Sequence, residues 1–241
     1  MKIAITDDIP AERDNLRKLA ESCFEEAGYP VAETVLFENG EALLAHFAPG
    51  QYDVLFLDIY MPGRNGIDTA FRIRQMDENV KIIFITTSND FAAESYRVRA
   101  DYYLQKPYSR SELMTAIKQL ELGDIQARTL LTLPDGQNVL LGAITHTTFS
   151  GHYVTIHRRT GTPVQVRCAQ GKFEKLLLPY RGFALCTKGV IVNFAAVARL
   201  ESDCFYLWDG TAVPISRRRS GEVRQAYNDY LIQTMRGGGK A

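Results

Sequence analysis

Short apolar runs alternate with amphipathic segments through the first half of the chain. The runs that predict strands occupy residues 2–6, 31–37, 54–57, 81–85 and 102–104. Apolar residues at helical spacing predict helices from Pro10 onward, over 41–47, 67–74 and 91–98, and after Ser109. Five strand–helix units predict an α/β fold with a five-stranded parallel sheet and helices on both faces.

The pattern changes after Thr129. Short strands separated by turns are predicted at 130–133, 139–141, 143–149, 152–158, 164–167, 182–186, 190–193, 197–201, 204–208 and 213–216. One amphipathic helix is predicted at 169–178, and residues 221–234 are helical in character. The second half is therefore predicted to be a mostly β domain.

The charge distribution also separates the two halves. The chain of 241 residues has no net charge, but residues 1–121 hold 13 Lys and Arg against 20 Asp and Glu, and the remainder holds 15 against 8. An acidic and a basic half indicate two domains with different partners. We expect domains at 1–121 and 129–236, a linker at 122–128 and a flexible tail at 237–241.

The composition predicts a soluble protein of the cytoplasm with no membrane partner. No apolar run approaches the roughly 18 residues of a membrane span, and the first residues lack the pattern of a signal peptide. The four cysteines form no CxxC pair, which favours reduced thiols. Cys186 is expected to be a buried small hydrophobe rather than a redox sensor, and the histidines lack metal-ligand spacing.

Polar side chains stand where the predicted strands of the first half end. The carboxyl ends of parallel strands share one edge of a sheet, so these side chains should converge; they are Asp7, Asp8, Asp58, Thr86 and Lys106. Clustered carboxylates repel one another unless a cation joins them, and Mg²⁺ prefers such oxygen ligands. Asp58 could then accept phosphorus as an aspartyl phosphate, with Lys106 paired to the phosphoryl charge and the Thr86 hydroxyl donating to it.

Four segments resemble the receiver domain of two-component response regulators: TDD at 6–8, LFLDIYMPGRNG at 55–66, IIFITT at 82–87 and LQKPY at 104–108. The resemblance implies that Asp58 is the phosphoacceptor and that a sensor histidine kinase is the donor. It implies that Asp8 and Asp58 bind Mg²⁺ directly, Asp7 through water, and Tyr60 through its main-chain carbonyl. It further implies that Thr86 and Tyr103 form the switch pair. It also implies that the peptide bond between Lys106 and Pro107 is cis.

Three segments of the second half resemble the LytTR-type DNA-binding domain: GHYVTIHRRTG at 151–161, KFEKLLLPYRGFALCTKGVIVN at 172–193 and WDGTAVPISRRRSGEV at 208–223. The resemblance implies that loops enter successive major grooves of double-stranded DNA. The expected contacts, best first, are Lys188, Arg217, His152, Lys172 and Arg218. Asn193 is expected to hold a turn in place rather than to read a base.

These features predict a non-enzymatic response regulator that dimerises when phosphorylated and binds paired promoter sites. One alternative is an aspartyl phosphotransferase or phosphatase acting on small molecules. Such enzymes carry a second carboxylate two residues after the nucleophile, and Tyr60 occupies that position. A second alternative is a receiver-controlled protein- or RNA-binding module, which a flat salt dependence would favour.

Overall fold

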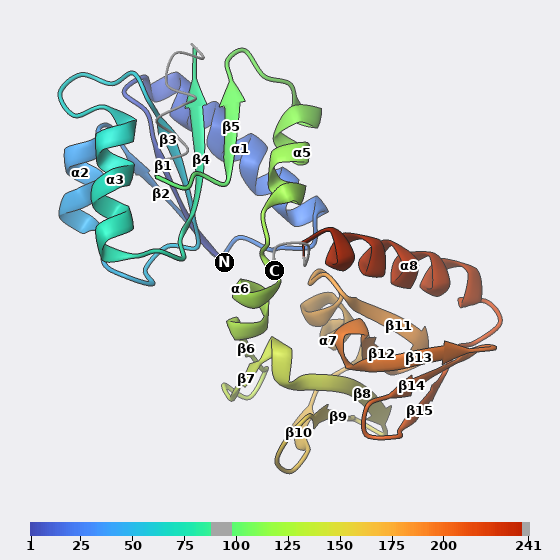
Figure 1. The fold of residues 1–241 in the computed structure, drawn as a ribbon. Helices are drawn as coiled ribbons and strands as arrows, with labels where there is room; N and C mark the ends of the chain where they lie inside the picture. Colours follow the sequence, from blue (N-terminus) through green and yellow to red (C-terminus); the bar gives the residue numbers. More distant parts are fainter. Residues whose placement is uncertain (88–97, 238–241) are drawn as a thin grey trace. The chain divides into compact units, whose positions relative to one another are not determined.

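A computed structural model describes residues 1–87 and 98–237, which divide into two compact units, Met1–Leu122 and Gly123–Ala241 (Figure 1). Nearly all of the helix expected at 91–98 lies outside the described residues, as does most of the expected tail. The two units are described separately below.

The first unit is built on a five-stranded parallel sheet. Its strands are β1 (Lys2–Thr6), β2 (Glu33–Phe37), β3 (Val54–Asp58), β4 (Lys81–Thr86) and β5 (Tyr102–Gln105). Their order is β2-β1-β3-β4-β5, and every neighbouring pair is parallel. The chain changes direction across the sheet between β1 and β3, and such a switch point is where open α/β sheets bind ligands. The predicted parallel α/β fold is confirmed.

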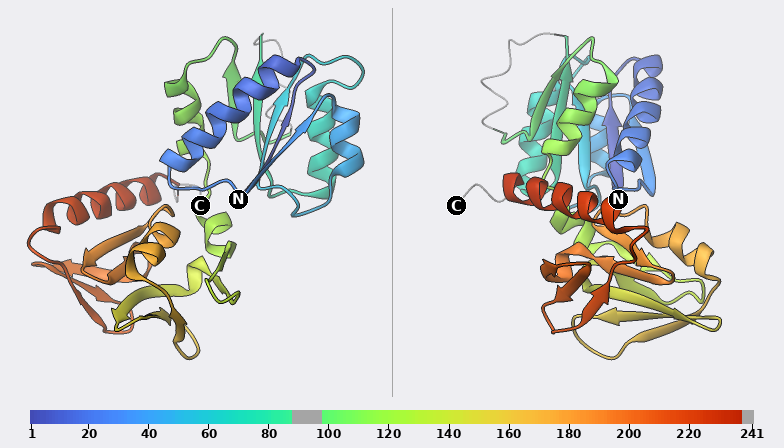
Figure 2. Two further views of the ribbon diagram at one scale, coloured as in Figure 1. Left: turned by 180° about the vertical axis from the view of Figure 1, so that it is seen from behind. Right: turned by 90° about the vertical axis from the view of Figure 1, so that its right-hand side faces the viewer.

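Helices cover both faces of this sheet. Helices α1 (Pro10–Glu26) and α5 (Arg110–Gln119) lie on one face, and α2 (Gly40–His46) and α3 (Gly66–Met76) on the other (Figure 2). The expected capping box begins α5, where Ser109 and Glu112 each accept from the other's backbone amide. Asn39 and Asn65 cap α2 and α3 in the same region of the unit, at the carboxyl edge of the sheet.

The second unit contains a five-stranded antiparallel sheet of order β10-β9-β8-β12-β11. Its strands are β8 (Ile144–Ser150), β9 (Tyr153–Arg158), β10 (Val164–Arg167), β11 (Phe183–Thr187) and β12 (Val190–Asn193). A three-stranded sheet comprises β13 (Val197–Glu201), β14 (Cys204–Leu207) and β15 (Ala212–Pro214), and a hairpin comprises β6 (Leu130–Thr132) and β7 (Asn138–Leu140). The unit is mostly β, as the sequence predicts.

Two apolar cores cover opposite faces of the larger sheet. Helix α7 (Gln170–Leu177) and the β6–β7 hairpin pack on one face, and helix α8 (Ser220–Gly237) with the three-stranded sheet packs on the other. Short 3-10 helices η1 (Leu141–Ala143) and η2 (Phe194–Ala196) connect strands and were not predicted.

The expected linker at 122–128 is different in the structure. Residues Gly123–Arg128 form helix α6, which belongs to the second unit. The Gln126 side chain donates to the Arg181 carbonyl at 2.7 Å. Ala127 lies so close to Gly142 that a Cβ there would come within 2.8 Å of the Ala127 side chain. Packing against η1 orders the segment as a helix.

Candidate functional site

Three carboxylates meet at the carboxyl edge of the parallel sheet. Asp7 and Asp8 follow β1, Asp58 ends β3, and one oxygen of each lies within 4.8 Å of the others. Asp7 and Asp58 are buried, 3% and 6% exposed, while Asp8 is half-buried. The neighbouring positions of β1 and β3 bring together acids that are about fifty residues apart in the chain.

Lys106 reaches this cluster from the end of β5. Its ammonium donates to Asp7 Oδ2 at 2.7 Å and to Asp58 Oδ2 at 3.4 Å, and it also contacts the Glu12 carboxylate in the first turn of α1. The peptide bond between Lys106 and Pro107 is cis. The Lys106 amide donates to the Thr86 carbonyl at 2.6 Å, which fixes the start of this loop to β4.

Burial and neighbouring charges shift the pKa values of the groups in this cluster. Burial raises the pKa of Asp58 to about 6; the charge of Lys106 opposes this shift and that of Asp7 adds to it. Burial alone would lower the pKa of Lys106, but its bonds to Asp7 and Glu12 and the charge of Asp58 raise it above its usual value. Burial raises the pKa of the neighbouring Tyr108 to about 12. Burial, more than the charges around it, therefore disfavours the Asp58 anion.

The loop after β3 aims Asp58 into the cluster. The Tyr60 amide donates to Asp58 Oδ1 at 3.3 Å, and the Gly66 amide donates to the Ile59 carbonyl at 3.0 Å. A Cβ on Gly66 would stand 2.1 Å from the Asp58 carbonyl oxygen, so glycine is required for this close approach. The Asn65 cap then starts α3. Residues 58–66 thus form a compact loop that holds the Asp58 carboxylate in place.

The expected switch residues lie on adjacent strands. Thr86 is fully buried at the end of β4, beside the cluster strand β3. Tyr103 on β5 is half-buried, and its ring lies against Phe84 with centroids 6.4 Å apart. The structure thus places both residues on strands that follow β3 in the sheet.

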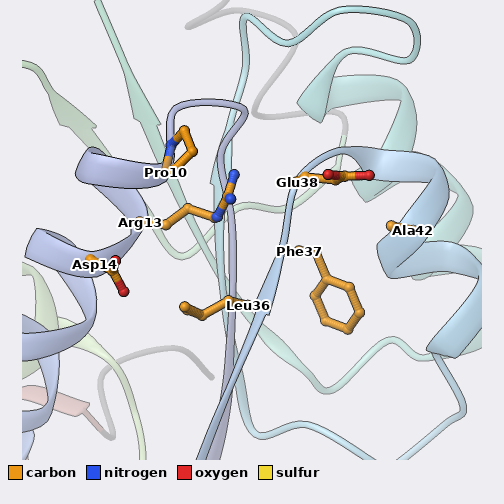
Figure 3. Close-up of a pocket in the computed structure, with 7 residues that line it drawn as sticks. All are labelled: Pro10, Arg13, Asp14, Leu36, Phe37, Glu38 and Ala42. Carbon is orange, nitrogen blue, oxygen red and sulfur yellow. The ribbon is translucent and has the colours of Figure 1, made fainter.

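Two contributors to the site were not predicted from the sequence. Glu12 contacts Lys106, and the Arg13 guanidinium donates to the Asp7 carbonyl. Arg13 also lines a cavity of about 350 Å³ between α1 and the end of β2. Figure 3 shows Arg13 extending toward β2, whereas Glu38 points away toward α2. Glu12 and Arg13 both lie in the first turn of α1, just after Pro10. This position, close behind Asp7 and Asp8 in the chain, was the sequence signal that could have indicated their contribution to the site.

The donor set fits Mg²⁺. The three carboxylate groups offer hard oxygen ligands within reach of one ion, and Asp58 is destabilised as an anion without added positive charge. Asp7, Asp8 and Asp58 are the residues that would hold it. Among residues 1–87 and 98–237, this is the one group of three or more acidic, His or Cys side chains gathered closely enough to bind a metal ion.

Four of the five expected DNA contacts of the second unit lie in turns near one end of its larger sheet, and Lys172 lies in the first turn of α7. His152 lies in the β8–β9 turn and Lys188 in the β11–β12 turn, and these turns are neighbours because β8 and β12 pair antiparallel. The His152 carbonyl accepts from Cys168, just before the helix that carries Lys172. The Ser216 amide, which precedes Arg217 and Arg218, donates to the Cys186 carbonyl at 3.0 Å.

Other polar residues of this unit serve its fold. Asn193 is buried; it donates to the Ile144 carbonyl at 2.8 Å and caps η2, as expected. The Arg158 guanidinium donates to the Thr162 carbonyl, and the Arg159 guanidinium donates to the Ala195 carbonyl at 2.6 Å. Cys186 is fully buried, and burial raises its pKa to about 12, so the thiol stays protonated at neutral pH.

The first unit is an open parallel α/β sheet that carries three carboxylates and a lysine at its carboxyl edge. Residues 3–118 match the family described as response regulator receiver domain, and the first unit of this chain belongs to that family. The chain is 33% identical over 134 residues to a positive alginate biosynthesis regulatory protein of Pseudomonas aeruginosa, covering 56% of this chain and 52% of the relative. It is 34% identical over 122 residues to the transcriptional regulatory protein LytR of Staphylococcus aureus, covering 50% and 47%.

Solved structures resemble about half of the chain. The response regulatory domain of mrkE from Klebsiella pneumoniae is 27% identical, covers 50% of this chain and 94% of its own, and has a TM-score of 0.43. TrrA from Thermotoga maritima, solved with Mg²⁺ and beryllium fluoride, is 34% identical, covers 49% and 98%, and has a TM-score of 0.39. The chain spans about half the length of the curated relatives it matches.

No helix among the described residues combines the length and apolar character that crossing a membrane requires.

Proposed function

We propose that this protein is a DNA-binding response regulator, phosphorylated on Asp58 by a sensor histidine kinase and controlling transcription through a LytTR-type second domain. The observation that carries the proposal is the buried Asp58 carboxylate, set beside Asp7 and Asp8 with the Lys106 ammonium 3.4 Å away. The receiver family of the first unit and the printed names of its regulatory relatives support it.

In this mechanism a carboxylate oxygen of Asp58 attacks the phosphorus of a phosphohistidine. The new P–O bond forms as the P–N bond breaks, and the imidazole leaves with the bonding electron pair. Bound Mg²⁺ supplies positive charge for the carboxylates and the transferred oxygens. Lys106 pairs with the phosphoryl group, and the Thr86 hydroxyl donates to it. Tyr60 supplies a main-chain carbonyl to the metal site.

The signal passes to the second domain through the switch pair. The phosphoryl group adds a charge of about −1.5 to −2, which draws Thr86 and Tyr103 toward Asp58 and changes the surface near β5. Two receivers then associate, and their paired DNA-binding domains gain avidity on two sites. Lys188 and Arg217 are the principal DNA contacts, with His152, Lys172 and Arg218 beside them.

The turns of the second unit support this assignment. His152, Lys188, Arg217 and Arg218 lie in connections between elements, Lys172 lies in the first turn of α7, and all five residues are exposed. Arginine to guanine is the commonest specific contact, while lysine more often positions a protein on phosphates.

Full-length protein incubated with acetyl phosphate and Mg²⁺ tests the first step. Intact mass and Phos-tag electrophoresis should show one phosphoryl group, with the Asp58→Asn variant as control. Modification of neither protein, or of both, would contradict the assignment of Asp58.

Selection of bound sequences from random double-stranded DNA, with and without phosphorylation, tests the second step. We expect tighter binding by the phosphorylated protein and a steep salt dependence. A flat salt response would favour a protein-binding module, and release of free phosphate from small esters would favour an enzyme.

A further inference from the structure

Glu12 is a fourth carboxylate at the rim of the aspartate cluster. It lies in the first turn of α1, and its carboxylate contacts the Lys106 ammonium that also bonds Asp7 and Asp58. The Glu12 side chain is 42% exposed, against 4% for Asp7 and 8% for Asp58. Lys106 is therefore shared between two buried acids and one acid that faces solvent.

We propose that Glu12 is a positioning residue that holds the Lys106 ammonium in the unphosphorylated protein and opposes its transfer to the phosphoryl group. The inference rests on the proposed function and concerns how readily Asp58 becomes phosphorylated. Lys106 is closer to Asp7 than to Asp58, by 2.7 Å against 3.4 Å, so its present partners hold it to one side of the phosphoacceptor.

The charges determine the direction of the effect. When Lys106 pairs with a phosphoryl group, Glu12 loses its cationic partner. The Glu12 carboxylate then lies near an added charge of about −1.5 to −2. Both changes stabilise the unphosphorylated protein relative to the phosphorylated one. Because Glu12 is partly exposed, solvent screens the interaction, and we expect changes of a few fold.

Glu12 has the opposite effect on a divalent cation. Its negative charge lies close to the same pocket and attracts Mg²⁺ along with the three aspartates. Neutralising Glu12 should therefore weaken Mg²⁺ binding and accelerate phosphorylation at saturating Mg²⁺. Local damage to the pocket would reduce both the affinity for Mg²⁺ and the rate of phosphorylation. The two measurements therefore distinguish electrostatic positioning from misfolding.

The experiment compares full-length wild type with Glu12→Gln, Glu12→Asp and Glu25→Gln. Glu25 is exposed on the same helix, about 20 Å further along, and its variant removes the same charge. Calorimetry gives the dissociation constant for Mg²⁺ alone. Acetyl phosphate at Mg²⁺ concentrations that saturate each variant gives the phosphorylation rate, which Phos-tag electrophoresis measures.

For Glu12→Gln we expect about two- to fivefold weaker Mg²⁺ binding and about two- to fivefold faster phosphorylation. Glu12→Asp should restore most of the wild-type behaviour, and Glu25→Gln should match wild type. The inference is overturned if Glu12→Gln lowers both the Mg²⁺ affinity and the phosphorylation rate, or if Glu12→Gln matches Glu25→Gln in both measurements. Wild type that binds Mg²⁺ but stays unmodified at Asp58 would overturn the proposed function as well.

Discussion

The imidazole rings of His146 and His157 stack face to face across β8 and β9, with centroids 4.0 Å apart and planes inclined by 4°. Thr145 Oγ1 lies 3.2 Å from His146 Nδ1, and Thr148 Oγ1 lies 3.3 Å from His157 Nε2. Burial and then the charge of His157 lower the pKa of His146 to about 4, against a smaller opposing effect of Asp209. The stack is therefore built from neutral rings.

The histidine stack should make the second unit sensitive to acid. An unfolded chain protonates His146 near its ordinary pKa of 6.5, whereas the folded chain does so near 4. The stabilising contribution is thus present above pH 6.5 and is lost as pH falls toward 4. We expect a loss of about 1–2 kcal/mol between pH 6.5 and 5. Urea unfolding followed by the fluorescence of Trp208, the single tryptophan, measures it.

The His146→Gln variant should lose much of this pH dependence, while His46→Gln, on the exposed end of α2, should keep it. An NMR titration that protonates His146 above pH 6 would contradict the prediction.

Asp58 should destabilise the first unit at neutral pH in the absence of divalent cations. Its folded pKa of about 6 exceeds the reference value of 3.8, so stability falls as pH rises through this interval. The Asp58→Asn variant should be more stable by about 1–3 kcal/mol at pH 7.5 in EDTA. Denaturant unfolding followed by circular dichroism checks this. The gain should disappear near pH 4, and exposed Asp14→Asn should show little gain at either pH.

A methyl group at position 66 should disrupt the loop that carries Asp58. The added Cβ of Gly66→Ala would meet the Asp58 backbone at 2.1 Å, and backbone atoms cannot move aside as a flexible side chain can. We expect a loss of about 2 kcal/mol or more and slower phosphorylation by acetyl phosphate. Gly171→Ala, in a helix with no atom within 4 Å of the new Cβ, should instead gain up to about 1 kcal/mol.

Arg217 should contribute to DNA affinity through its charge. The Arg217→Ala variant should bind a selected duplex more weakly by about 1–3 kcal/mol if the side chain reads a base. If it contacts phosphate, the slope of log K against log salt should fall by about 1. Fluorescence anisotropy at several salt concentrations separates these outcomes. Lys175→Ala, exposed on α7, is the matched control, and an equal effect of both variants would indicate only nonspecific charge.

The sequence predicted the structure correctly where strands, helix caps and turns depend on residues that are close together in the chain. Apolar runs followed by acids located β1 and β3, and the parallel order that strand–helix alternation implies required Asp7, Asp8 and Asp58 to share one edge. The capping residues of α5 and the Asn193 turn were likewise readable, because each depends on neighbours only a few residues away.

Local inference failed where the structure depends on residues that are distant in the sequence. Residues 122–128 were expected to link the two domains, yet Gly123–Arg128 form α6 because η1 and Arg181, distant in the sequence, offer this segment partners. The sequence also did not show that backbone carbonyls accept the guanidinium groups of Arg158 and Arg159.

The sequence by itself therefore determined the order of elements, the acid cluster and the lysine that joins it, because strand period and parallel topology follow from local pattern. Only the tertiary structure decided that Lys106 also meets Glu12, that burial raises the pKa of Asp58, and that two imidazoles stack as neutral rings. Burial and charge depend on every atom within several ångströms, and chain folding brings those atoms from positions that no sequence spacing specifies.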